Sequence, residues 1–230
     1  FYLFGGAKSD VSGDVALSDL WEDDPLTNLW RWIKGTSTFN ANGIYGTKGV
    51  ADVANNPGGR YYGYGGIIND KFYMFGGFGF GVAGGYGQLN DLWEFDMNTN
   101  NWRWLTGINA TDGLGIYGTL QTYSSTNTPS SRRTFTGAIG NGTLYVFGGS
   151  GNSQSPGGGQ LNDLWEYDPT INQWRWLKGQ TNINNIGVYG NVGVASASSL
   201  PGSREQTVIN YINGSLYLFG GRGYNSIAGN

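Results

Sequence analysis

Two sets of charged residues recur at a fixed spacing that could support chemistry. Both sets repeat every 72 residues: Arg60, Arg132 and Arg204, and Asp19, Asp91 and Asp163. Clustered arginines bind anions, and converging aspartates bind calcium or act as acids and bases. An active site is asymmetric, however, whereas each of these residues takes one equivalent position per repeat. The spacing therefore favours a structural contact that each repeat makes once.

A glycine-rich segment offers a second possibility, the binding of a phosphate group. Residues 79–84 match the pattern G-x-G-x-x-G, but the dinucleotide-binding form of this pattern opens a helix. Here more glycines and a second strand pattern follow, so the segment is not expected to bind a nucleotide. No unrepeated pair of carboxylates stands out that would suggest glycoside hydrolysis.

Composition narrows the remaining classes of function. The chain has no cysteine and no histidine, which removes disulfides, thiolate nucleophiles, histidine bases and the commonest metal ligands. The net charge is −3, and the 13 lysines and arginines are scattered, so no nucleic-acid partner is expected. The sequence contains no apolar run of about 18 residues, so membrane insertion is not expected. We expect neither a metal nor a cofactor.

The repeated charges belong to a longer repeat that contains every tryptophan. Residues 89–96 read Leu-Asn-Asp-Leu-Trp-Glu-Phe-Asp, and a Trp-Arg-Trp segment follows them. Matching copies begin at residues 17 and 161. Six of the nine tryptophans define the pattern: Trp21, Trp93, Trp165, Trp30, Trp102 and Trp174. Because a buried Trp removes about 150–250 Å² from water, these rings are predicted to form the core.

Each repeat also predicts a tight β-hairpin. Apolar runs closed by Gly-Gly end at residues 6, 77, 149 and 221, and three of them follow a strand that starts at a repeated arginine. The joins Asn69-Asp70, Asn141-Gly142 and Asn213-Gly214 tolerate the positive φ of a two-residue turn. Two further strands follow, with a glycine-rich loop of about ten residues before the first. If a four-residue turn joins these two strands, Glu94 lies opposite Arg103 in the antiparallel pair.

Four antiparallel strands per repeat, with no helical periodicity, indicate the blades of a β-propeller. The Gly-Gly run, Asn-Asp-Leu-Trp-Glu-Phe/Tyr-Asp and the Trp strand resemble the Kelch repeat of the galactose oxidase and Kelch class of propellers. The resemblance spans essentially the whole chain, but the repeat is about 72 residues long rather than about 50. The excess is a long loop with a Gly-Ile/Val-Tyr-Gly tetrad. Galactose oxidase relatives bind copper through Tyr and His, and this chain supplies no His.

The predicted fold is thus all-β, a single propeller segment over 1–230 with two complete and two partial blades. Its parts are a partial blade with its long loop (1–59), two blades with their loops (60–131 and 132–203) and a partial blade (204–230). We expect either a segment of a longer chain or blades completed between neighbouring copies of this one. Because strands alternate in direction, the long loops and the glycine-rich loops should emerge on one face.

Aromatic residues in those loops are the candidate ligand contacts. Those outside the repeat are Phe78, Phe80, Tyr86 and Tyr123, and those within it are Tyr45, Tyr117 and Tyr189. A periodic tyrosine between glycines more often packs a loop onto its own blade, so the unrepeated rings are the better candidates. Three N-x-Ser/Thr sites at Asn109, Asn141 and Asn213 could carry glycans in a secreted protein.

These observations predict a non-enzymatic scaffold or adhesion module, extracellular or on the cell surface. Its long-loop face would bind a protein or a polysaccharide. One alternative is part of a carbohydrate-binding or galactose-oxidase-like enzyme whose catalytic residues lie outside this segment. The other alternative is a structural protein that self-assembles into rings or fibres by sharing blades.

Overall fold

The structure, a computed structural model, describes residues 1–10 and 13–226. The chain folds into two compact units, Phe1–Gly113 and Leu114–Asn230, which are taken in turn. Both consist of antiparallel sheets, and the described residues include no α-helix. The final four residues of the predicted partial blade 204–230 lie outside the described residues.

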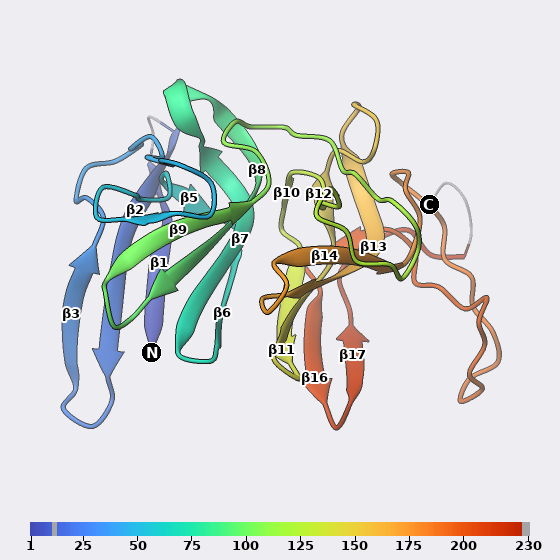
Figure 1. The fold of residues 1–230 in the computed structure, drawn as a ribbon. Coiled ribbons are helices and arrows are strands. Elements are labelled where there is room, and N and C mark those ends of the chain that lie inside the picture. The colour runs from blue at the N-terminus through green and yellow to red at the C-terminus, as the bar shows by residue number, and fades with distance from the viewer. Residues whose placement is uncertain (11–12, 227–230) are drawn as a thin grey trace. The chain divides into compact units, whose positions relative to one another are not determined.

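The first unit contains two sheets (Figure 1). The smaller has the order β1 (Tyr2–Asp10), β2 (Gly13–Asp24), β3 (Leu29–Lys34). The larger has the order β4 (Ala51–Asp52), β9 (Asn101–Thr106), β8 (Tyr86–Asp96), β7 (Lys71–Phe80), β5 (Arg60–Tyr61). Strand β6 (Tyr64–Ile68) also pairs with β7, and a 3-10 turn, η1 (Val82–Gly84), caps the β7–β8 hairpin.

The second unit repeats this plan. Its first sheet has the order β10 (Arg132–Arg133), β12 (Thr143–Gly151), β13 (Gly159–Asp168), β14 (Gln173–Lys178), with β11 (Thr136–Gly140) also on β12. The last blade has two strand pairs: β15 (Arg204–Glu205) with β18 (Arg222–Gly223), and β16 (Val208–Ile212) with β17 (Ser215–Phe219). The predicted propeller segment of four-stranded blades, two of them partial, is confirmed.

Two local features differ from the expected strands. The first strand of each complete blade is split, into β5 and β6 or β10 and β11, because Tyr62 and Thr134 take φ of 60° and 52°. The glycine-rich connection is also shorter than expected. Strands β7 and β8 stay paired as far as Phe80 and Tyr86, so only residues 81–85 join them.

The turns have the backbone that their residue types demand. Asn69 and Asp70 have φ of 48° and 57°, and Asn141 and Gly142 have 50° and 75°, which confirms the two-residue hairpins. The Gly-Gly pair has a separate role. The β7–β8 register shifts between Phe75 and Gly77, and Gly76 there has φ of 60°. A β-bulge of this kind favours glycine.

Pairing between the third and fourth strands follows the predicted register. Glu94 lies opposite Arg103, and the Arg103 guanidinium lies 2.8 Å from the carboxylate. Glu22 pairs with Arg31, and Glu166 with Arg175, in the same way. Glu94 is buried and also accepts hydrogen bonds from Lys71 and Tyr73. Glu94 therefore binds two cationic side chains and one tyrosine hydroxyl.

Acidification should weaken the fold through Glu94. Burial by itself would raise the pKa of Glu94, but hydrogen bonds from Tyr73, Arg103 and Lys71 outweigh burial and hold the pKa below 4.5. The ionised form therefore contributes stability at pH values above 4.5, and this contribution is lost as the pH falls through the lower folded-state pKa. We expect Glu94→Gln to reduce the slope of unfolding free energy against pH below pH 4.5, measured by urea denaturation. An unchanged slope would contradict this assignment.

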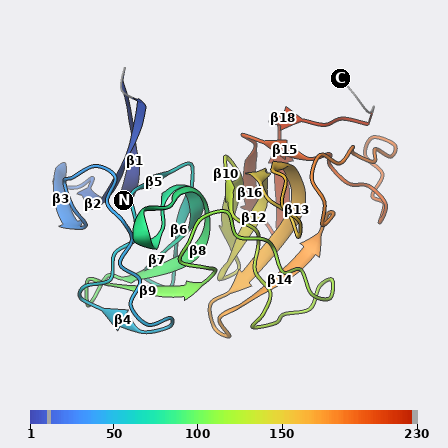
Figure 2. The same cartoon turned by 90° about the horizontal axis from the view of Figure 1, so that it is seen from above.

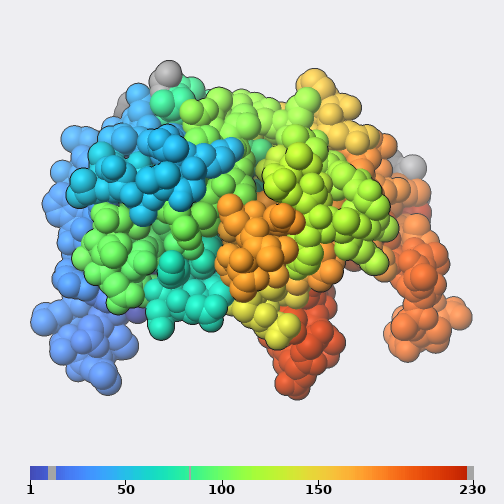
Figure 3. Space-filling view, viewed as in Figure 1, coloured from blue at the N-terminus to red at the C-terminus, as the bar shows by residue number. Residues whose placement is uncertain are grey.

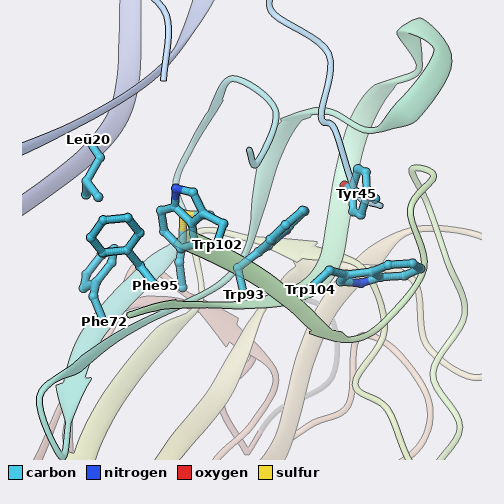
Figure 4. Packing of buried hydrophobic residues seen from close by; sticks show 8 residues of the cluster. Leu20, Tyr45, Phe72, Trp93, Phe95, Trp102 and Trp104 are labelled. Atoms are coloured by element: carbon cyan, nitrogen blue, oxygen red, sulfur yellow. The ribbon is translucent and has the colours of Figure 1, made fainter. Parts of the chain in front are cut away.

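The core of the first unit is a cluster of aromatic rings (Figure 4). Trp102 is fully buried, and its ring centroid lies 5.1 Å from Phe95 and 5.6 Å from Phe4 of the neighbouring blade. Trp104, two residues on, lies on the same face, as the strand period requires. Trp30, the counterpart of Trp102 in the first blade, is instead 53% exposed. The expectation that every repeated Trp is core is wrong here, because no neighbouring blade among the described residues covers this ring as Phe4 covers Trp102.

The long loop contacts its own blade, where Asn40 and Ala16 exchange hydrogen bonds, and it also pairs with the blade that follows. Strand β4, from the loop 34–59, pairs with β9 of the next blade, as Figure 2 shows from above. The light-blue loop atoms lie against the green atoms of that strand in Figure 3. The expected packing of the periodic tyrosine on its own blade is corrected, since the Tyr45 ring contacts Trp93 and Trp104 of the next blade. The loop and the β7–β8 hairpin do share one end, since Gly43 N–H donates to the Gly81 carbonyl.

Candidate functional site

The repeated arginine and aspartate meet in a buried ion pair. The Nη1 and Nη2 atoms of Arg60 lie 2.6 and 2.8 Å from the two carboxylate oxygens of Asp91. The Tyr45 hydroxyl and the Trp93 indole N–H also donate to this carboxylate, at 2.6 and 2.7 Å. Both charged side chains are buried. Arg132, Asp163, Tyr117 and Trp165 repeat the arrangement.

This geometry supports the structural interpretation of both periodic sets. The Arg60 guanidinium donates its hydrogen bonds to Asp91 and to the carbonyls of Gly58 and Gly76. Burial would lower the pKa of Arg60, but Asp91 raises it, so the cation persists. Each cluster joins the first strand, the third strand and the preceding long loop of its blade. The cluster is therefore a structural ion pair that holds these three segments together.

The partial blades carry incomplete versions of this cluster. Asp19 accepts the Trp21 indole N–H at 2.6 Å and has no arginine partner among the described residues. Arg204 donates to the Gly202 and Gly220 carbonyls and to the Tyr189 hydroxyl, with no aspartate partner in the described part of the chain. Tyr189 is accordingly 61% exposed.

Two of the tyrosines predicted to bind a ligand prove to be core residues. Tyr45 and Tyr117 are buried, and each ring packs between two tryptophans of the following blade. Burial, followed by the nearby Asp91 charge, raises the pKa of Tyr45. These two residues offer no surface to a ligand, which corrects the expectation. Their hydroxyls are needed by the buried aspartates instead.

Three of the unrepeated aromatic residues assemble on the first unit into a cluster in which Tyr86 is exposed and the other rings are half-buried. Phe78 and Phe80 lie two residues apart on β7, and Tyr86 on β8 is paired directly with Phe80. The Tyr86 centroid lies 4.8 Å from Phe78 and 4.9 Å from Phe80. Tyr61 on β5 is opposite Phe78, and its hydroxyl lies 2.8 Å from that of Tyr86. We call Tyr61, Phe78, Phe80 and Tyr86 the aromatic cluster.

Sequence analysis missed Tyr61 and the adjoining Tyr62, whose rings are 4.7 Å apart. Comparing the repeats position by position would have found them. Tyr61 corresponds to Arg133 and Glu205, although the arginine before each of the three is constant. Phe78 likewise corresponds to Ser150 and Arg222. In the second unit these positions form a polar group instead.

That polar group occupies the equivalent place in the second unit. The buried Glu205 carboxylate accepts hydrogen bonds from Thr134 at 2.7 Å and from Gln160 at 3.3 Å. Arg222 donates to the same carboxylate at 2.5 Å. The blades therefore share one scaffold and differ in the side chains that surround the β7–β8 hairpin and its equivalents.

The remaining predicted residues lie elsewhere. Tyr123 is in the second unit, where the Arg175 guanidinium lies 4.6 Å from its ring. It therefore packs beside β14, and burial raises its pKa to about 12. Asn141 and Asn213 occupy exposed hairpin turns, and Asn109 follows β9. Their glycosylation remains a prediction.

Two kinds of feature are absent from the described residues. No three acidic side chains in residues 1–10 and 13–226 converge as a metal site requires. None of these residues belongs to a helix long and apolar enough to cross a membrane.

Repeated four-stranded blades, fastened by buried ion pairs, place this chain among the β-propellers. The model of the Kelch motif matches residues 131–175. The solved structure of YjhT, a Kelch-type propeller, is similar over 97% of this chain and 74% of that chain, with a TM-score of 0.51 and 14% identity. No curated protein sequence matches. The chain thus has a β-propeller fold and contains a Kelch motif at residues 131–175.

Proposed function

We propose that this chain is a non-enzymatic binding module that presents its long-loop face to a partner. The observation that carries the proposal is the contrast between constant and variable positions. The buried Arg–Asp ion pairs recur in both complete blades. The side chains around the β7–β8 hairpin and its equivalents differ from blade to blade. On a repeated scaffold, loop-end side chains that vary around a constant frame fit recognition better than a structural role.

The partner class is a protein or a polysaccharide. Kelch repeats generally mediate protein–protein interaction, which favours a protein. Exposed aromatic rings can also stack on sugars, so a polysaccharide is the alternative that the experiment must separate. The acidic, cysteine-free and glycine-rich composition supports an extracellular or cell-surface setting. The sugar-enzyme and self-assembly alternatives gain no specific support from the described side chains.

Removing the aromatic cluster should abolish binding. We expect Phe80→Ala/Tyr86→Ala to lose the ligands that the unmodified chain selects from a random-peptide array or a glycan array, because these rings supply the apolar contact area. Circular dichroism would verify that the fold is intact.

A matched control keeps this test specific. Ile67→Ala alters an apolar side chain of similar exposure, 47% against 42% for Tyr86, beside the tight Asn69-Asp70 turn, and should retain binding. Selected ligands that bind the double variant unchanged would overturn the proposal, and turnover of a sugar alcohol would overturn its non-enzymatic part. Peptide or glycan selectivity would decide between the two partner classes.

A further inference from the structure

The aromatic cluster adjoins an acidic side chain, Asp14, that forms no ion pair within the part of the chain that the structure describes. Asp14, on β2, accepts a hydrogen bond from the Tyr61 hydroxyl at 3.3 Å and another from the Ser9 hydroxyl. No ion pair to Asp14 occurs among the described residues. The ammonium of Lys8 lies over the Phe39 ring, 5.8 Å from its centroid. A carboxylate thus stands at the edge of four aromatic rings.

The direction of the hydrogen bonds makes the centre of this cluster electron-rich. A tyrosine hydroxyl carries one proton. Because Tyr61 donates its proton to Asp14, the proton in the Tyr61–Tyr86 contact must come from Tyr86. Burial and the Tyr86 hydrogen bond raise the pKa of Tyr61, so the Tyr61 phenol keeps its proton. Neither central hydroxyl then has a proton left for a ligand.

The site consequently presents ring faces, hydroxyl lone pairs and a carboxylate. An anionic group would meet repulsion and no central donor. A sugar hydroxyl would find acceptors there but no central donor in return. A cation is attracted both by the ring quadrupoles and by the carboxylate.

We propose that the aromatic cluster with Asp14 binds a cationic side chain, arginine or lysine, of a protein partner. This inference rests on the proposed binding function and specifies its ligand. The exposure of Tyr86, 42%, and of Asp14 leaves the cluster open to a protruding side chain. The partner is thus a protein with an exposed basic segment.

The test uses NMR titration of the 230-residue chain with four synthetic peptides. Each has a Gly-Ser background around one central residue: arginine, citrulline, lysine or trimethyl-lysine. We expect saturable shifts of Tyr61 and Tyr86 with the three cationic peptides and none with citrulline, which has the shape of arginine without its charge. Trimethyl-lysine should still bind, because cation–π attraction needs no N–H donor.

Variants separate the contributions of the rings and the carboxylate. Tyr86→Phe keeps the ring and should retain cation binding, whereas Tyr86→Ala should weaken it roughly three- to thirtyfold. Asp14→Asn keeps the shape, removes the charge and should also weaken binding severalfold. Equal binding of arginine and citrulline peptides, or unchanged affinity in Asp14→Asn, would overturn the inference.

The two proposals fail in different ways. Array ligands that need Phe80 and Tyr86 but contain no cation would leave the binding function standing and remove the cationic ligand. Array ligands indifferent to those rings would remove both.

Discussion

Arg60→Met is expected to destabilise the protein by about 3–5 kcal/mol, the cost of leaving a buried charge without its partner. Methionine keeps an apolar stem of similar length but removes the guanidinium. Among the described residues, the buried Asp91 carboxylate would keep the Tyr45 hydroxyl and the Trp93 indole N–H as its side-chain donors. The free energy of unfolding, measured by urea denaturation with tryptophan fluorescence, would report the loss.

The chain contains a matched control for this substitution. Arg204 occupies the same repeat position but has no aspartate partner among the described residues, so Arg204→Met should cost under about 1 kcal/mol. The double variant Arg60→Met/Asp91→Leu should recover part of the lost stability, because replacing a whole buried pair costs less than breaking it. Equal losses at positions 60 and 204 would show that the ion pair is not the source of the stability.

Trp102→Ala is expected to cost about 3–5 kcal/mol, because it opens a cavity in the core of the first unit. The ring is fully buried and contacts Phe4 of one blade and Phe72, Trp93 and Phe95 of its own. Its loss would therefore weaken both the blade and its packing against the neighbouring blade. The same denaturation experiment measures the effect.

Two companion variants sharpen this prediction. Trp30→Ala removes the same residue type from the same repeat position, but Trp30 is 53% exposed and should cost under about 1 kcal/mol. Trp102→Phe should cost much less unfolding free energy than Trp102→Ala. The indole nitrogen has no hydrogen-bond partner among the described residues, and phenylalanine keeps an aromatic ring. Similar costs for Trp30→Ala and Trp102→Ala would refute the role of blade packing.

The aromatic cluster shows how far the sequence could lead toward the candidate site. Phe78, Phe80 and Tyr86 stood out because they break the repeat, and the structure brings them together. Tyr123, chosen on the same ground, lies in the other unit beside Arg175. Tyr61 escaped notice because its neighbour Arg60 made the segment look purely structural. Departures from the repeat identify the variable positions, but they do not show which of these positions are in contact in the folded chain.

The sequence by itself determined the blade: its strand pairing, its tight turns and the opposition of Glu94 to Arg103. These features depend on period-two alternation, turn residues and short loops, all of which act within a few residues along the chain. Only the tertiary structure decided that the long loop covers the following blade, burying Tyr45 while Trp30 stays exposed. Burial of this kind depends on contacts between blades. For Tyr45 and Asp91 those contacts join residues 46 positions apart, beyond the reach of any local pattern.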